Sequence, residues 1–230
     1  MKYINKALIL IIIIILIFGC TPFFITSNFD IVTADHSTIA ILPFHMTYTG
    51  LIPEELAEDD YIIIEEGESK AFMISYFNEI LRSTKSGKKP IRINLQHYTN
   101  TLNILEENEI SIMDSWDLNS EKLADLLGVD AVVRGSIQKN QLIHDLTSYG
   151  IEVGLHVINI LTDHSLFPWI PFNATKSKEV DASYDLINGK DGSILWSISY
   201  EVEADWRQTA NDIIDSINRR SSKKFPYRVK

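Results

Sequence analysis

Residues 123–137 read LADLLGVDAVVRGSI, and this stretch decides the fold because it marks where a helix ends and a buried strand begins. Asn119 or Ser120 can cap a helix that runs to Leu127. Gly128 then supplies the left-handed residue with which helices commonly end. Residues 129–137 follow as a strand, so the sequence predicts a helix that leads directly into a sheet.

The segments before this unit predict an alternation of strands and helices. Residues 38–44 (TIAILPF) form a compact apolar run, and residues 91–97 (IRINLQH) alternate between apolar and polar side chains, as strands do. Apolar side chains recur at helical spacing in the second half of residues 61–82, and residues 99–109 also have a helical pattern.

The segments after residue 173 predict a hairpin and a closing helix. Residues 179–186 and 194–202 alternate on either side of the turn Asn188-Gly189-Lys190-Asp191-Gly192. Residues 206–220 place Trp206, Ala210, Ile213 and Ile217 at helical spacing. The order β-α-β-α-α-β-hairpin-α predicts an α/β (α+β) fold, with a mixed β-sheet flanked by helices in a single domain.

Length and composition exclude several classes of protein. The chain has 230 residues, 45% of them hydrophobic, which excludes wholesale disorder. A net charge of −10 argues against nucleic acid as the main partner. The single cysteine excludes an internal disulfide and any metal site built from several cysteines.

The first residues have the pattern of a secretory signal peptide. Lys2 and Lys6 precede an unbroken apolar run over residues 7–18. A helix of that length rises about 18 Å, short of the roughly 30 Å hydrocarbon core of a bilayer. An uncleaved anchor is the less favoured alternative.

The run ends in Ile17-Phe18-Gly19-Cys20, which resembles the bacterial lipobox. The resemblance implies cleavage before Cys20 and attachment of acyl chains such as palmitate to its sulfur and its new amino group. An ordinary signal peptide with an incidental cysteine is the alternative. By resemblance to Gram-negative sorting, Thr21 favours the outer membrane, facing the periplasm. We therefore expect a signal peptide over residues 1–19, a lipidated cysteine and tether over 20–37, a domain over 38–227 and a tail over 228–230.

Four stretches together resemble a known group of proteins: TIAILPF, LADLLGVDAVVRGSI, ASYDLINGKDGSILWS and RRSSKKFPY. The group consists of uncharacterised secreted or lipid-anchored proteins of Bacteroidetes type. A more distant resemblance extends to the TolB amino-terminal domain, the curli secretion lipoprotein and the lipoprotein activators of peptidoglycan synthases. It implies that Asp130 caps or braces the strand entry and that Trp196 lies in the core. Residues 138–173 depart from the pattern as a variable, insert-like region.

The resemblance implies a function by binding rather than by catalysis. The predicted function is a non-enzymatic envelope lipoprotein, a protein-binding or scaffold module on the membrane, with another envelope protein as partner. The first alternative is a ring-forming secretion or pore component like the curli exporter, and an oligomeric state therefore remains an alternative. A hydrolase of an envelope polymer is the second.

The motifs do not predict an enzyme or a cofactor. The six histidines, His36, His45, His97, His144, His156 and His164, lack the spacing of a helical metal site. No nucleophile elbow or phosphate-binding glycine loop is present in the sequence. We predict no catalytic, cofactor-binding or metal-binding residues.

Three stretches remain as candidate surfaces. Phe167, Trp169 and Phe172 share the six-residue segment FPWIPF with two prolines, and they form either a partner surface or a lid over the sheet. A basic cluster near the carboxyl end complements a helix dipole or contacts anionic lipid headgroups; it consists of Arg219, Arg220, Lys223 and Lys224. An acidic stretch is expected to form a solvated face or mobile loop, with Ca²⁺ or a basic partner as alternatives; it consists of Glu54, Glu55, Glu58, Asp59, Asp60, Glu65, Glu66 and Glu68.

Overall fold

The structure is a computed structural model that describes residues 23–50, 52, 56–85, 90–140, 149–151, 178–204 and 208–228. The strands are β1 (Phe23–Ile25), β2 (Thr38–Ile41), β3 (His45–Tyr48), β4 (Asn94–Leu95), β5 (Ala131–Lys139), β6 (Lys178–Asn188) and β7 (Ile194–Ala204). The helices are α2 (Phe29–Val32), α3 (Glu58–Lys85), α4 (Tyr98–Glu107), α5 (Ile112–Asp117), α6 (Ser120–Leu127) and α8 (Ala210–Ser222).

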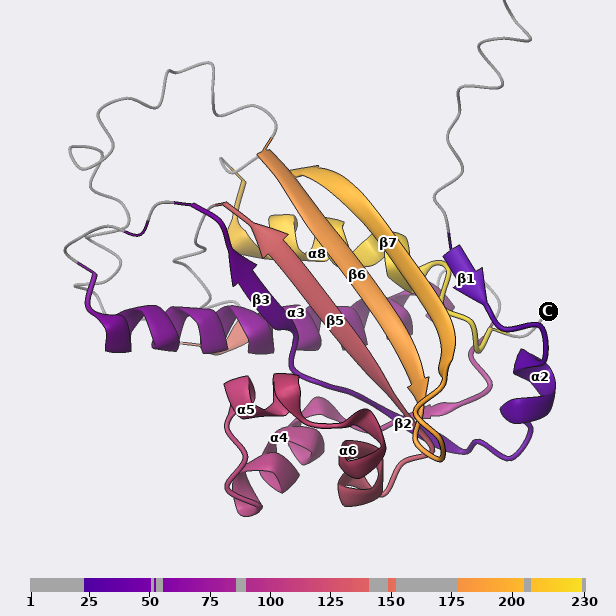
Figure 1. Cartoon of the computed structure of the whole chain (residues 1–230). Coiled ribbons are helices and arrows are strands. Elements are labelled where there is room, and N and C mark those ends of the chain that lie inside the picture. The colour runs from indigo at the N-terminus through magenta and orange to yellow at the C-terminus, as the bar shows by residue number, and fades with distance from the viewer. Residues whose placement is uncertain are drawn as a thin grey trace, which may run out of the picture.

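The described strands form one mixed sheet in the order β1-β7-β6-β5-β2-β4, with β3 pairing with β5 as well (Figure 1). Strands β2 and β3 run parallel to β5, and β4 runs parallel to β2. The β5–β6, β6–β7 and β1–β7 pairs are antiparallel. The predicted fold class, a mixed sheet flanked by helices in a single domain, is confirmed.

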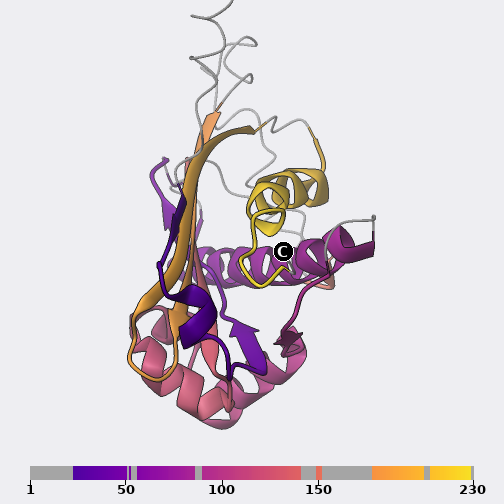
Figure 2. The same ribbon diagram turned by 90° about the vertical axis from the view of Figure 1, so that its right-hand side faces the viewer.

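Helices cover the two faces of the sheet unequally. Figures 1 and 2 show α3 and α8 side by side on one face, while α4, α5 and α6 gather near one end of the sheet. Ala131, Val132 and Val133 are all buried because the start of β5 is covered on both faces. From Arg134 onward, β5 alternates between buried and exposed or half-buried residues. This end of the sheet therefore has one open face.

The helix stop and strand entry predicted at residues 128–130 are confirmed. Gly128 has a left-handed backbone with φ of 65°, and Val129 N donates to Ala124 O at 2.9 Å. At the start of α6, the side chain of Asn119 accepts from Glu121 N at 2.7 Å. Of the two candidate caps, Asn119 is the one used.

Asp130 braces the entry into β2, the strand that pairs with β5, whereas the resemblance implied a brace at the strand that follows Asp130 itself. Its Oδ2 accepts hydrogen bonds from Ser37 N at 2.7 Å, Thr38 N at 2.9 Å and Ser37 Oγ at 3.1 Å. Burial acts to raise the pKa of Asp130, but these hydrogen bonds outweigh it and lower the pKa below its ordinary value. Trp196, the other residue singled out, is fully buried in the core.

A buried polar network fixes α3 and α8 against the sheet. Tyr184 OH on β6 donates to Asn218 Oδ1 on α8 at 2.8 Å, and Asn218 Nδ2 donates to Phe72 O on α3 at 3.0 Å. Tyr76 OH and Ser221 Oγ lie 2.9 Å apart. These contacts satisfy polar groups in the core, and they specify how the two helices lie relative to the sheet.

The structure differs from the expected element order at four places. Residues 23–25 and 29–32 form β1 and α2 within the stretch assigned to the tether, because β1 pairs with β7 and Phe29 enters the core. Strand β3 follows Pro43, and α5 lies between the two expected helices. Helix α8 begins at Ala210, after the cap Thr209, whereas Trp206 lies outside the described residues.

Candidate functional site

The residues predicted to act as sites lie outside the described part of the chain. This holds for Cys20 and for Phe167, Trp169 and Phe172, as it does for most of the insert-like region 138–173. The functional surfaces described below therefore come from other residues.

The first surface is the open face of the sheet, which we define as the side of β3, β5, β6 and β7 opposite to α3 and α8 (Figure 2). Most of its described side chains are polar, and Ile187 and Ile194, near the hairpin turn, are apolar exceptions. The polar side chains include Thr47, Ser136, Gln138, Asp181, Ser183, Asp185, Ser197, Ser199, Glu201 and Glu203.

The open face carries acidic residues in register. Gln138 on β5 lies opposite Asp181 on β6, and Asp181 lies opposite Glu201 on β7. Asp181, Glu201 and Glu203 are all exposed. A negatively charged surface of this kind is complementary to a basic protein surface.

Arg134 bounds the open face and fixes the neighbouring helices. Its Nε donates to Ser120 Oγ at 2.6 Å, and its Nη1 donates to Trp116 O at 2.7 Å; Nη2 donates to Leu118 O. The guanidinium thus satisfies carbonyl groups at the end of α5 and joins them to the start of α6. Arg134 therefore has a structural role on this face.

The second surface lies at the β1 edge of the sheet, where the described chain begins. We define the β1 patch as four exposed apolar side chains: Phe23 (52% exposed), Phe24 (51%), Ile25 (43%) and Ile31 (79%). Phe29, between them, is buried and meets the ring of Tyr227 edge-on at 5.3 Å. The buried Phe29 therefore fixes α2 beside β1 while the other apolar groups face outward.

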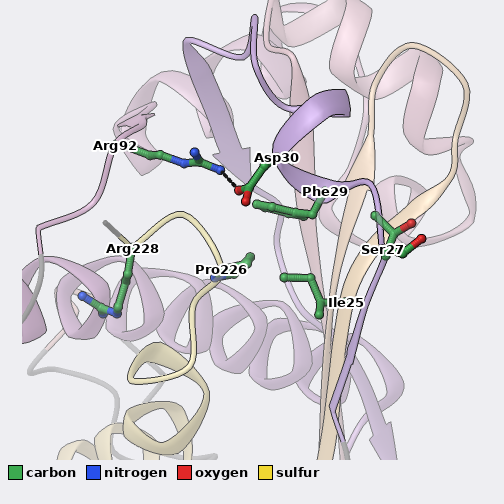
Figure 3. A pocket seen from close by; sticks show the side chains of 8 residues that line it. Ile25, Ser27, Phe29, Asp30, Arg92, Pro226 and Arg228 are labelled. Carbon is green, nitrogen blue, oxygen red and sulfur yellow. Dashed lines mark hydrogen bonds and ion pairs between the residues drawn. The ribbon is translucent and has the colours of Figure 1, made fainter. Parts of the chain in front are cut away.

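A pocket of about 390 Å³ lies beside the β1 patch (Figure 3). It is bounded by β1, α2, the segment before β4 and the carboxyl-terminal turn. Its lining consists of Ile25, Thr26, Ser27, Phe29, Asp30, Arg92, Pro226 and Arg228.

An ion pair closes one side of this pocket. Figure 3 shows Arg92 reaching toward Asp30, and Arg92 Nη2 lies 2.8 Å from Asp30 Oδ1. The guanidinium carbon of Arg92 also lies 5.9 Å from the centre of the Phe29 ring. Both charged side chains are substantially exposed, so we assign the pair a modest contribution to stability.

The basic cluster at the end of α8 divides among different contacts. Arg220 lies over the Tyr200 ring at 4.9 Å, and Arg219 Nε lies 3.7 Å from Glu79 Oε2. Lys224 Nζ lies 5.4 Å from the centre of the Phe23 ring. The end of α8 and the β1 patch, about two hundred positions apart in the sequence, are therefore neighbours.

The acidic stretch is not a uniform solvated face, which corrects the expectation from its charge. Glu58, Asp59 and Asp60 do lie in the first turn of α3, where the helix dipole favours them. Glu65 and Glu68, however, are buried. The helix turns these two side chains inward, toward polar partners on β5 and within α3.

The inward carboxylates have identifiable partners. Lys139 Nζ on β5 lies 2.8 Å from Glu68 Oε1. Tyr61 OH donates to Glu65 Oε1 at 3.3 Å. Burial raises the pKa of Glu65, although Tyr61 and Lys139 oppose the change. The charged groups form a buried polar cluster at the end of β5, close to where the insert-like region begins.

The described histidines contact separate partners. His36 Nδ1 lies 2.6 Å from Tyr227 OH, the His45 and Trp116 rings are tilted with their centres 4.8 Å apart, and His97 caps α4. His144, His156 and His164 lie outside the described residues. Among the described residues, no three His, Cys, Asp or Glu side chains gather as metal ligands would. Nor does any helix in that part of the chain have the length and apolar character needed to cross a membrane.

No protein-family model matches the chain, and no curated protein does. Several solved structures are similar to it. Lipoprotein GNA1162 from Neisseria meningitidis has 12% identity and a TM-score of 0.43, covering 82% of this chain and 96% of that chain. The C-terminal domain of LpoB from Salmonella enterica has 14% identity and a TM-score of 0.36, covering 73% and 83%. PelC from Paraburkholderia phytofirmans, a dodecamer, has 8% identity and a TM-score of 0.41, covering 85% and 89%.

Proposed function

We propose that this chain is a non-enzymatic lipoprotein of the cell envelope that binds another envelope protein. Acyl chains on Cys20 hold it on the periplasmic side of the outer membrane. The observation that carries the proposal is the segment Ile17-Phe18-Gly19-Cys20, in which the only cysteine of the chain stands where a lipobox requires it. Two or three acyl chains hold a protein on a bilayer almost permanently, because each buried methylene contributes about 0.8 kcal/mol.

The open face of the sheet is the proposed binding surface. It is polar and acidic, and its exposed carboxylates Asp181 and Glu201 lie opposite each other on adjacent strands. Exposed carboxylates on adjacent strands give this face a negative charge that is complementary to a basic surface. The partner that we propose is accordingly an envelope protein with a basic surface. Phe167, Trp169 and Phe172 are a second candidate contact.

Site-specific photo-crosslinking in living cells tests the binding surface. A photoreactive amino acid at Ser199, exposed on the open face, is expected to give one discrete adduct with another envelope protein. The same amino acid at Ile63, which is 50% exposed on α3, serves as the matched control and is expected to give none. An adduct of two copies of this chain would instead indicate self-association.

Charge reversal tests whether the adduct depends on the charges of the open face or only on the overall charge of the protein. The double variant D181K/E201K is expected to abolish the Ser199 adduct. The control E106K/E107K reverses two exposed charges on α4 and is expected to leave the adduct unchanged. Equal adduct yields from both variants would contradict the proposed surface. Loss of the adduct only in a third variant, W169A, would show that the contact lies at residues 167–172 instead.

A further inference from the structure

The β1 patch stands directly beside the predicted lipid anchor. Cys20 precedes Phe23 by three positions. Three residues span at most about 11 Å, even when fully extended. If Cys20 carries acyl chains in a bilayer, the exposed side chains of Phe23 and Phe24 are held within about a nanometre of the headgroups.

Positive charge lies next to these apolar side chains. The ammonium group of Lys224 is 5.4 Å from the centre of the Phe23 ring, and Lys223, its neighbour, is exposed. Aromatic and aliphatic side chains combined with lysines are typical of surfaces that lie at the headgroup level of anionic membranes. The whole chain is acidic, with a net charge of −10, so this combination of lysines and apolar side chains distinguishes the β1 edge from the open face.

The length of β1 argues against a strand from another protein as the occupant. The strand has three residues, and all three of its side chains are at least 43% exposed. An added strand would gain few main-chain hydrogen bonds along so short an edge, and it would leave the side chains of Phe23 and Phe24 in water. A bilayer surface would cover side chains on both sides of the strand.

We propose that the β1 patch, together with Lys223 and Lys224, docks on the anionic phospholipid headgroups of the membrane that holds Cys20. The inference rests on the proposed lipidation. The anchor attaches the domain to the membrane, and the docked patch fixes its orientation. Because β1 is an edge strand of the sheet (Figure 1), a domain docked there presents the open face sideways, accessible to a protein partner.

The test uses the lipidated full chain, purified in detergent and reconstituted into vesicles. Acylation of Cys20 occupies the only native thiol, so one introduced cysteine can be labelled with a fluorophore. The labelled positions are Phe24→Cys and Ile31→Cys in the β1 patch. The controls are Ile52→Cys, after β3, and Ile63→Cys on α3, which are 49% and 50% exposed.

Quenching by phospholipid that carries a nitroxide on its headgroup reports proximity to the bilayer surface. In vesicles of phosphatidylethanolamine and phosphatidylglycerol, we expect severalfold stronger quenching at positions 24 and 31 than at 52 and 63. Pure phosphatidylcholine vesicles should reduce the difference, and so should K223E/K224E. The matched charge reversal K122E, on an exposed residue of α6, should not.

Failure of the docking and failure of the proposed lipidation would give different results. Equal quenching at all four positions, in protein that is acylated and floats with the vesicles, would overturn the docking and leave the lipoprotein proposal intact. Protein that lacks the acyl mass and does not float would overturn the proposed function itself. A crosslink between two copies through position 24, with no quenching there, would make a second copy the occupant and would also overturn the docking.

Discussion

Lys139 Nζ on β5 lies 2.8 Å from Glu68 Oε1 on α3, and the two side chains are only 2% and 1% exposed. Lys139 also lies 5.6 Å from the centre of the Tyr48 ring on β3. Burial lowers the pKa of Lys139, while the charge of Glu68 and its hydrogen bond raise it. The pair therefore joins α3 to the sheet at the expense of desolvating two charges.

Removing one partner of this pair should be far more damaging than removing both. E68Q or K139M leaves the other group without its partner in the core and is expected to lower the free energy of unfolding by about 3–5 kcal/mol. The double variant E68M/K139M should recover most of that loss. Urea denaturation followed by tryptophan fluorescence measures all three. A double variant no more stable than the single ones would contradict the assigned pairing.

Asp130 should make the protein sensitive to acid. Replacing it by alanine removes the acceptor for Ser37 N and Thr38 N, and it is expected to cost about 1.5–3 kcal/mol at pH 7. Because the folded pKa of Asp130 lies below the ordinary value of 3.8, its contribution is present above that pH and is lost as the pH falls through the folded pKa.

The comparison of wild type with D130A across pH tests this assignment. The stability difference should stay constant from pH 7 to about 5 and shrink below the ordinary aspartate value of 3.8. A control variant, D125A, removes an exposed carboxylate on α6, and its stability difference from the wild type should not shrink at low pH. A difference that grows on acidification would mean that the folded pKa is raised.

Replacing either of two glycines by alanine should destabilise the protein, for a different physical reason in each case. A Cβ at Gly135 would overlap the ring of Phe44, so G135A is expected to lose about 1–3 kcal/mol through overpacking. At Gly128 nothing lies within 4 Å of the added atom, but φ is 65°, so G128A should lose about 1 kcal/mol through backbone strain.

A companion substitution distinguishes the two causes. G135A should be partly rescued by Phe44→Leu, since the smaller side chain makes room, whereas G128A should not. G128N should be milder than G128A because asparagine tolerates the left-handed region. Thermal unfolding of the five variants gives the comparison, and equal losses in G128N and G128A would contradict the role given to Gly128.

Arg134 should control the order of α5 and α6. R134K keeps the charge but cannot reproduce the bonds to Ser120 Oγ, Trp116 O and Leu118 O, so hydrogen exchange over residues 112–122 is expected to accelerate. Exchange in the β6–β7 hairpin, which Arg134 does not brace, should stay unchanged. Protection of residues 112–122 equal to that of the wild type would show that the helices hold without the guanidinium.

Local signals account for the parts of the fold that the sequence predicted. Asn119, Gly128 and the hairpin turn at residues 188–192 act on their immediate neighbours, so their effects can be read without the tertiary structure. Strand β1 and helix α2 gave no such signal. They form because Phe23 to Ile25 pair with β7, more than one hundred and seventy positions later, and because Phe29 meets Tyr227.

The described functional surfaces also depend partly on local sequence patterns and partly on contacts that only the folded chain makes. The alternation in residues 179–186 and 194–202 predicted one polar side for β6 and β7, yet only the packing of α3 and α8 on the other side shows that this side stays open. The charge of the acidic stretch predicted a solvated face. In the structure, Glu68 instead pairs in the core with Lys139, which lies on a strand remote in sequence. The basic cluster could be read as a helix-end feature, but its contact with Phe23 required the folded chain.

Intact-mass analysis of the protein isolated from its native membrane tests the central claim most directly. We expect a chain that begins at Cys20 and carries the added mass of a diacylglyceryl group on sulfur, with or without a third acyl chain on the amino group. A chain that retains residues 1–19, or one whose cysteine reacts as an unmodified thiol, would contradict the proposed membrane attachment, and the orientation derived from it would then have no basis.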